Sequence, residues 1–195
     1  TEHAKEFIKL YGDKYLDCGE DERKQALIDY ALEKNISALK TDLEKYRIHY
    51  DVWFRESLLH KNDEVTSAIE RLRKNGYTYD EDGAVWLNCL VRQNGIPTYF
   101  AADIAYHINK LETRNFDLAI NIWGADHHGH VARMKNALSA VGIDSGRLEI
   151  VLMQLVRLMQ DGEIVRMSKR TGKAITLNDL LEDVSIDEAR FFFNM

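Results

Sequence analysis

Residues 117–156, DLAINIWGADHHGHVARMKNALSAVGIDSGRLEIVLMQLV, contain the pattern that determines the expected fold. The apolar run at 117–123 does not alternate with polar residues, which is typical of a strand buried on both faces. A glycine follows it, then an amphipathic helical pattern at 131–141 and a second apolar run at 148–156. Strand, glycine turn, helix and strand form a βαβ unit of a parallel sheet. We therefore expect an α/β fold that binds its ligand at 124–130, where the first strand ends.

The rest of the chain is predicted to alternate between helices and short β elements. Apolar residues at steps of three and four indicate helices, and a β-rich run on each side of an Asp-Gly turn indicates a hairpin. In chain order, the predicted elements are a helix at 21–47, a strand at 50–54, a helix at 63–74, a hairpin at 77–87 and a helix at 99–112.

The segment after the second strand begins with Asp161-Gly162, a predicted turn, and continues as a basic loop. Two capping-box patterns follow, in which Ser or Thr precedes an acidic residue by three positions. They predict two short helices, one at 177–183 behind Thr176 and one at 186–193 behind Ser185.

Composition narrows the class of protein. Of the 195 residues, 45% are hydrophobic and one is proline, so a core can be buried and long disordered linkers are not expected. No apolar run reaches the roughly 18 residues of a membrane span. We therefore expect no membrane association. The cysteines, Cys18 and Cys89, lack a C-x-x-C spacing, so we expect no disulfide framework and a reducing cytoplasm. The net charge of −6 does not indicate a general nucleic-acid binder, so a polyanion partner must be met by local patches.

The sequence GADHHGH, 124–130, has three interpretations. It can be a glycine turn with solvated polar side chains. It can be a metal site, because Asp126 and His130, and His127 and His130, are spaced to share a helical face; the Asp-His-His triplet is also similar to the signature of a superfamily of metal-dependent phosphoesterases. It can be a nucleotide site, in which Gly124 permits close backbone approach and Asp126 accepts from ribose hydroxyls.

Two further segments carry candidate chemistry. The basic loop RMSKRTGK, 166–173, is either a solvated surface loop or a mobile clamp for the phosphates of a nucleotide. In PTYFAADIAYH, 97–107, Tyr99 and Asp103 are four residues apart on one helical face. They form either an ordinary acidic helix start or a pocket for a cation, because a carboxylate binds a guanidinium through a bidentate pair of hydrogen bonds.

Taken together and in this order, these segments resemble arginyl-tRNA synthetase of bacterial type, a class I aminoacyl-tRNA synthetase. The similarity runs through NGIPTYFAADIAYH, INIWGADHHGH, RMSKRTG and DEARFFF, and RMSKR is similar to the K-M-S-K-S motif of that class. It is strong over 90–195, and YGDKYL, YALEK, DVWF and GYTYDEDGAVWL extend it over most of the remaining chain.

The resemblance implies a function and a set of site residues. The implied reaction is the ATP-dependent ligation of L-arginine to tRNA(Arg) through arginyl-adenylate, with Mg²⁺ arriving on the nucleotide rather than on a protein metal site. The implied arginine-binding residues are Tyr99, Asp103 and His127; the ATP-binding residues are Gly124, Asp126, His130 and Met167; and the catalytic residues of the mobile loop are Arg166, Ser168 and Lys169.

The resemblance also implies how the chain is organised: a helical segment at 1–50, a connective insertion at 51–97, and at 98–195 the second half of a Rossmann-like nucleotide-binding domain that contains the mobile loop. The sequence departs from the family in carrying Arg166 in place of the first lysine of the motif and in lacking the H-I-G-H motif. Cys89 directly precedes Leu90 where relatives often carry a longer, charged loop, so either the loop is short or a disordered stretch is absent from this sequence. We expect a fragment that is inactive alone, and we expect the whole enzyme to be a monomer. Two alternatives stay open: a metal-dependent phosphoesterase of the DHH type and a non-catalytic arginine-binding module.

Overall fold

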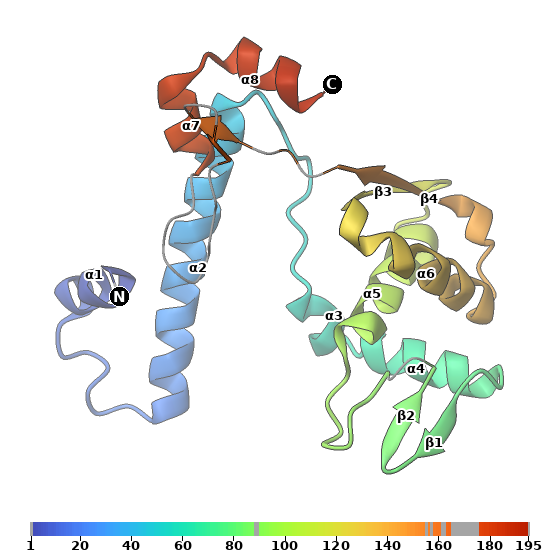
Figure 1. The fold of residues 1–195 in the computed structure, drawn as a ribbon. Coiled ribbons are helices and arrows are strands. Elements are labelled where there is room, and N and C mark those ends of the chain that lie inside the picture. The colour runs from blue at the N-terminus through green and yellow to red at the C-terminus, as the bar shows by residue number, and fades with distance from the viewer. Residues whose placement is uncertain are drawn as a thin grey trace. The chain divides into compact units, whose positions relative to one another are not determined.

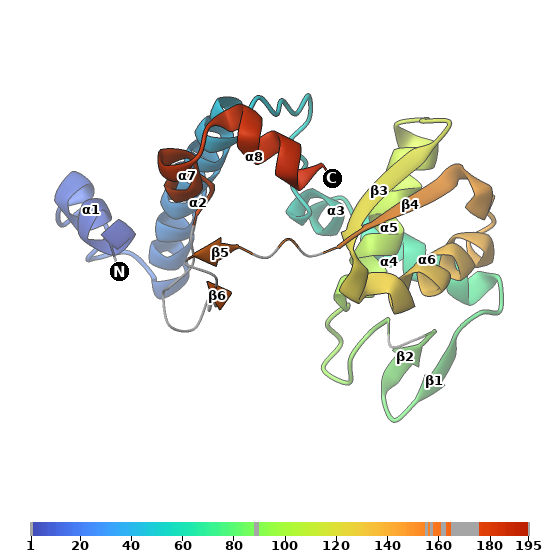
Figure 2. The ribbon, with the colours of Figure 1, turned by 45° about the horizontal axis from the view of Figure 1, so that its top comes forward.

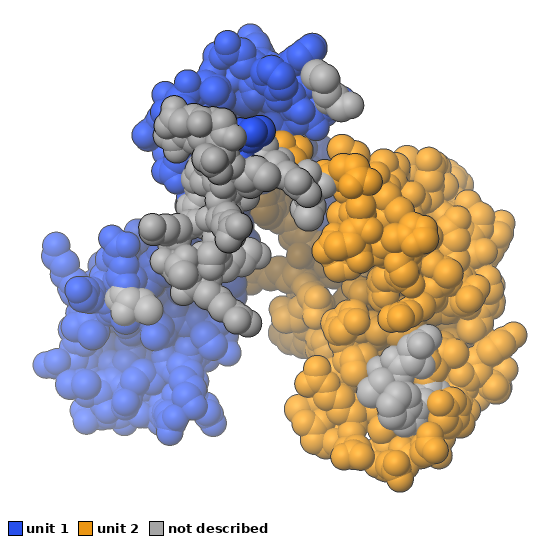
Figure 3. Space-filling view, in the orientation of Figure 1, with its two compact units in different colours: residues 1–52, 158–195 blue, residues 53–157 orange. Residues whose placement is uncertain are grey.

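The computed structural model describes residues 2–87, 90–154, 156, 158–160, 163–164 and 176–194. The chain forms two compact units, shown in different colours in Figure 3. Unit 1 comprises residues 1–52 and 158–195, and unit 2 comprises residues 53–157. This grouping does not test the expected division at residues 50 and 97, which stays a prediction.

Unit 1 is built on one long helix, α2 (Glu20–Lys45), which confirms the helix predicted at 21–47 (Figure 1). The shorter α1 (Glu2–Tyr11) packs against it through aromatic rings. The Phe7 ring, buried between the two helices, lies 5.6 Å from that of Tyr30 on α2, in an edge-on arrangement. Such aromatic pairs add to the free energy gained from apolar burial.

Two short helices, α7 (Leu177–Asp183) and α8 (Ile186–Phe193), complete unit 1, with the predicted bounds. Both capping boxes are formed, Thr176 with Asp179 and Ser185 with Glu188. The Arg190 guanidinium joins α8 to the end of α2 by donating to the Tyr46 carbonyl at 2.9 Å. Strands β5 (Met159–Gln160) and β6 (Glu163–Ile164) pair antiparallel, and the turn predicted at Asp161-Gly162 lies outside the described residues.

Unit 2 contains the βαβ unit, and its elements lie close to the predicted ranges (Figure 2). None of the helices in the described part of the chain is long and apolar enough to cross a membrane. In chain order the helices are α3 (Ser57–Lys61), α4 (Glu64–Lys74), α5 (Tyr99–Ile108), the π-helix η1 (Asn109–Thr113), the 3₁₀ helix η2 (Ala125–His127), α6 (His128–Ala140) and the 3₁₀ helix η3 (Ser145–Arg147); the strands are β1 (Tyr79–Glu81), β2 (Ala84–Trp86), β3 (Ala119–Gly124) and β4 (Leu148–Met153).

Strands β3 and β4 pair in parallel, Ala119 opposite Leu148 through Gly124 opposite Met153, which confirms the parallel βαβ unit. The expectation that β3 is buried on both faces is wrong. Ala119 and Asn121 are buried, whereas Ile120 and Ile122 are 56% and 71% exposed. The physical reason is that the described helices α5 and α6 pack on one face of this pair, so the strand alternates between a covered and an open face.

The hairpin predicted at 77–87 is formed by β1 and β2. Asp82 and Gly83 have φ values of 51° and 74°, as a type I′ turn requires at its two central residues. Residues 88–89, at which relatives are expected to carry a longer loop, lie outside the described residues.

The strand predicted at 50–54 is wrong, because these residues form no strand. A strand needs a hydrogen-bonded neighbour, and the sheets among the described residues pair only β1 with β2, β3 with β4, and β5 with β6. Phe54, the last residue of this segment, packs against a helix instead. The Phe54 ring stacks on the Tyr106 ring of α5, with 4.4 Å between their centroids.

The core of unit 2 lies between α3, α4, α5, α6 and the covered face of the sheet. Burial of each large apolar side chain contributes about 1.5–3 kcal/mol relative to leaving it exposed. The core therefore holds α5 firmly against β3, the two elements that carry the candidate site. Its largest fully buried side chains are Leu59, Leu72, Leu90, Ile104, Leu111, Met134, Leu138 and Leu148.

Candidate functional site

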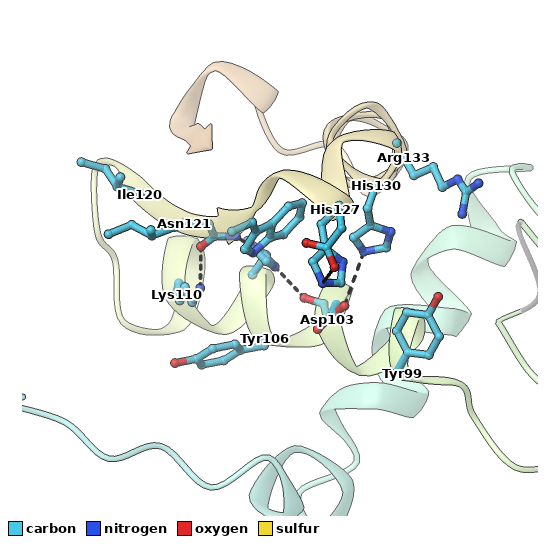
Figure 4. Close-up of a pocket in the computed structure, with 14 residues that line it drawn as sticks. Tyr99, Asp103, Tyr106, Lys110, Ile120, Asn121, His127, His130 and Arg133 are labelled. Carbon is cyan, nitrogen blue, oxygen red and sulfur yellow. Dashed lines mark hydrogen bonds and ion pairs between the residues drawn. The ribbon is translucent and has the colours of Figure 1, made fainter. Parts of the chain in front are cut away.

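A pocket of about 720 Å³ lies in unit 2 between α5, β3 and the turn into α6 (Figure 4). Five of the side chains singled out in the sequence line it, three assigned to arginine and two to ATP: Tyr99, Asp103, His127, Asp126 and His130. These residues are up to 31 positions apart, and the fold brings them together because α5 packs beside the carboxyl end of β3.

The turn after β3 has the geometry that a strand-end site needs. Gly124 ends the strand, η2 carries Asp126 and His127, and α6 starts at His128, so the N-terminus of a helix faces the pocket. Backbone N–H groups at a helix start favour an anion such as phosphate.

Gly124 is needed for space rather than for unusual backbone dihedral angles. Its φ of −64° and ψ of 147° are ordinary extended values. A Cβ added there would collide with the Oδ1 atom of Asp126. The glycine therefore lets the Asp126 carboxylate fold back against the strand end, a reason that the sequence alone did not reveal.

Asp103 places a partly buried carboxylate inside the pocket. Burial raises the pKa of this carboxyl above its ordinary value, and the nearby His130 opposes that shift. The Oδ2 atom of Asp103 lies 3.6 Å from Nε2 of His130. A carboxylate in such a place costs free energy unless a cation accompanies it, so the pocket is suited to a positively charged ligand.

His130 is held among aromatic rings. Its ring centroid lies 5.3 Å from those of Phe100 and Trp123 and 6.2 Å from that of Tyr99. Its Nε2 atom is buried and makes no hydrogen bond to any described residue. This imidazole therefore has an unused donor or acceptor that faces Asp103.

His127 and Tyr99 are the more open members of the site. The Tyr99 side chain is 69% exposed at the pocket rim. The Nε2 atom of His127 lies 3.8 Å from Oδ2 of Asp126, and its ring lies 6.4 Å from that of Trp123. Both side chains are free to adjust to a ligand, in contrast to His130.

Several pocket residues were not singled out in the sequence: Tyr106, His107, Lys110, Ile120, Asn121, Ile122, Trp123, Gly129 and Arg133. A sequence signal existed for two of them. His107 follows Asp103 by four positions, so it continues the helical face of Tyr99 and Asp103. Asn121 is a polar residue in the middle of an apolar strand, and a buried amide needs hydrogen-bond partners.

The predicted loop residues Arg166, Met167, Ser168 and Lys169 lie outside the described residues. The roles assigned to them, and the roles assigned to the pocket residues, stay predictions. In the part of the chain that the structure describes, no three His, Cys, Asp or Glu side chains converge to form a possible metal site.

Comparison with known proteins identifies a family for nearly the whole chain. The sequence profile of the family described as "tRNA synthetases class I (R), catalytic domain" matches residues 1–192. Curated arginine–tRNA ligases from Caldanaerobacter subterraneus subsp. tengcongensis and Ruminiclostridium cellulolyticum are 57% and 55% identical to this chain over its full length. The chain spans 36% of the length of each.

Solved structures agree with the sequence comparison. A Campylobacter jejuni protein described as an arginyl-tRNA synthetase superposes with a TM-score of 0.85 and 34% identity, over 98% of this chain and 43% of that one. The Thermus thermophilus arginyl-tRNA synthetase gives a TM-score of 0.65 over 92% of this chain and 39% of that one. Its identity of 16% shows a shared fold alone.

Proposed function

This chain belongs to the catalytic-domain family of the class I arginyl-tRNA synthetases, and we propose that the protein carrying it ligates L-arginine to tRNA(Arg) at the expense of ATP. The observation that carries the proposal is the partly buried Asp103 carboxylate, which lines a pocket between α5 and the nucleotide-type strand end of β3. Family membership favours this activity over that of a phosphoesterase with a similar Asp-His-His triplet.

We propose that Asp103 binds the guanidinium of arginine. A guanidinium presents two parallel N–H groups that match the two oxygens of a carboxylate. Tyr99 lines the same pocket from one turn earlier in α5, where its ring and hydroxyl can orient the guanidinium plane. His127, across the pocket, can supply a further hydrogen bond.

ATP binding is proposed for the strand-end turn. Gly124 lets the nucleotide approach the backbone, Asp126 accepts from the ribose hydroxyls, and the start of α6 attracts phosphate oxygens. His130 and Met167 complete the proposed ATP site. ATP would bring Mg²⁺ on its phosphates, where the ion would neutralise developing negative charge.

The proposed reaction has two steps. A carboxylate oxygen of arginine attacks the α-phosphorus of ATP, the bond to pyrophosphate breaks, and arginyl-adenylate forms. A ribose hydroxyl of the terminal adenosine of tRNA then attacks the arginyl carbonyl, and AMP leaves. Catalysis consists of positioning and charge stabilisation, with Arg166, Ser168 and Lys169 proposed to stabilise the leaving phosphates.

Several finer statements belong to the same proposal. They are the three-part division at 1–50, 51–97 and 98–195, the monomeric state, and the cytoplasmic location expected from the cysteines. The acidic net charge of −6 requires that tRNA be met by local basic patches or by other parts of the longer protein.

The proposed function is tested by calorimetric titration of the full-length protein carrying this sequence. The titrants are a non-hydrolysable arginyl-adenylate analogue and the matching lysyl analogue. We expect the arginyl compound to bind and Asp103→Asn to weaken its binding at least about tenfold, as expected for loss of a charged hydrogen bond. Asp117→Asn, at an exposed carboxylate outside the pocket, is the matched control. Equal binding of both analogues, or unchanged affinity in Asp103→Asn, would refute the proposed arginine pocket.

A further inference from the structure

A chain of hydrogen bonds runs along the wall of the pocket from η1 through β3 to α5. Lys110 Nζ donates to Asn121 Oδ1 at 3.1 Å. The Asn121 amide nitrogen lies 2.7 Å from Nε2 of His107, and Nδ1 of His107 lies 2.7 Å from the backbone carbonyl oxygen of Asp103. Figure 4 shows Lys110 and Asn121 on the same side of the pocket, joined by a dashed line.

The two ends of this chain determine the direction of every hydrogen bond. A lysine ammonium can only donate, and a carbonyl oxygen can only accept. His107 must therefore carry its proton on Nδ1 and accept on Nε2. The Asn121 amide must then direct its nitrogen toward His107 and its oxygen toward Lys110, so each polar group has a complementary partner.

Burial makes this arrangement costly to disturb. His107 and Asn121 are only 3% and 8% exposed. Burial lowers the pKa of His107 to about 4, which keeps the imidazole neutral, and its two hydrogen-bond partners then select the tautomer. Removing one member leaves its buried neighbours without a hydrogen-bond partner. This loss destabilises the folded state more than the loss of an exposed hydrogen bond does.

The hydrogen bonds connect the two parts of the site. Asp103 and His107 are one turn apart on α5, and Asn121 lies on β3, three residues before Gly124. The π-helix η1, a wide turn of a kind often found at functional sites, carries Lys110, whose Nζ lies 4.3 Å from the centroid of the Tyr106 ring. The turn of α5 that carries Asp103, the carboxylate proposed to bind arginine, is thus hydrogen-bonded directly to β3, the strand that ends in the proposed ATP site.

We propose that His107 and Asn121 are positioning residues that hold Asp103 at a set distance from the carboxyl end of β3, so that arginine is presented correctly to ATP. This inference rests on the proposed function. Neither residue need touch a substrate; both act through the Asp103 turn. Their loss should therefore affect arginine binding and the chemical step more than ATP binding.

The test uses Asn121→Ala in the full-length protein carrying this sequence, assayed for aminoacylation with tRNA present. We expect KM for arginine to rise about tenfold, because a buried hydrogen-bond partner is lost, and kcat to fall, while KM for ATP changes little. Asn109→Ala is the matched control. Asn109 is also a buried asparagine after α5, but its amide donates to Glu64 on α4, away from the pocket. This variant should lose thermal stability and keep its KM for arginine.

A double mutant tests whether the two residues act as one unit. His107→Leu removes both ring nitrogens, and we expect its loss in kcat/KM for arginine to be similar to that of Asn121→Ala. The combined variant should lose no more than about the larger single loss, because the shared interaction can be removed only once. Fully multiplicative losses would overturn the inference.

The outcomes separate this inference from the proposed function. An unmodified protein that does not charge tRNA with arginine would refute the proposed function and the inference with it. An active protein in which Asn121→Ala leaves KM for arginine unchanged would refute the inference alone. If Asn121→Ala is recovered unfolded, Asn121→Ser replaces it, since a hydroxyl is less costly to bury there than a methyl group but, on a shorter side chain, cannot bridge Lys110 and His107 as the amide does. KM for arginine should again rise while KM for ATP changes little, and an unchanged KM for arginine would refute the inference.

Discussion

The Nε2 atom of His130 on α6 lies 3.6 Å from the Oδ2 atom of Asp103 on α5, and the imidazole nitrogen makes no hydrogen bond to any described residue. The imidazole therefore lies against the carboxylate that is proposed to bind arginine. Burial raises the pKa of this carboxyl, so arginine binding should depend on pH.

We expect KM for arginine to rise as the pH falls into the acid range, because a protonated Asp103 no longer attracts a guanidinium. Burial raises the pKa of Asp103, so this carboxyl begins to lose its charge at a higher pH than an exposed aspartate. Glu56 and Lys110 face the same carboxyl and act in opposite directions on its pKa. Asp103→Asn has no carboxyl to titrate, so its KM for arginine, measured by initial rates, should be higher throughout and change less with pH. An identical pH dependence in both proteins would show that Asp103 is not the group that titrates.

His107 should remain neutral through the pH range in which exposed histidines titrate. Its pKa is lowered to about 4, so the buried imidazole resists protonation in the folded state. The stability that the neutral ring contributes is present above the ordinary histidine pKa and is lost as the pH falls toward 4. NMR of ¹³C-labelled histidine, with the signal assigned by its loss in His107→Leu, should show no titration above about pH 5. A His107 signal that titrates near pH 6.5 would contradict the buried, neutral tautomer.

Gly124→Ala should weaken ATP binding. The added Cβ would collide with the Asp126 carboxylate, which would have to move away from the strand end. We expect KM for ATP to rise about tenfold, as expected when the displaced carboxylate no longer accepts hydrogen bonds from the ribose, with a smaller change for arginine. Gly19→Ala is the control, because an added Cβ there meets no atom within 4 Å. Equal effects of the two substitutions on KM for ATP would count against the role of Gly124.

Lys169→Ala should lower the rate of arginine activation more than it weakens ground-state binding of ATP. The reason is the growing negative charge on the leaving pyrophosphate, which a lysine point charge stabilises most in the transition state. Single-turnover kinetics and equilibrium binding give the two quantities separately. Lys173→Ala, a substitution in the same basic segment, should lower the rate of arginine activation less than Lys169→Ala does. Equal losses in rate and in binding for Lys169→Ala would contradict the transition-state role.

Local features of the chain could be predicted well because they depend on neighbouring residues. The capping boxes at Thr176 and Ser185 predicted α7 and α8 with the observed bounds, since each box closes its hydrogen bonds within four residues. The Asp82-Gly83 turn predicted the hairpin for the same reason. Tyr99 and Asp103 could be placed on one helical face, and both line the pocket.

The sequence by itself determined most of the order of helices and strands, the parallel βαβ unit and, through the spacing of Tyr99 and Asp103 and the polar turn after β3, five of the residues that line the pocket. Tertiary structure alone decided which groups meet across elements. The open face of β3, the missing strand at 50–54 and the hydrogen bond between Asn121 and His107 all depend on what packs beside a segment. Local propensity carries no information on that packing, because the same apolar run can face a helix, another strand or solvent.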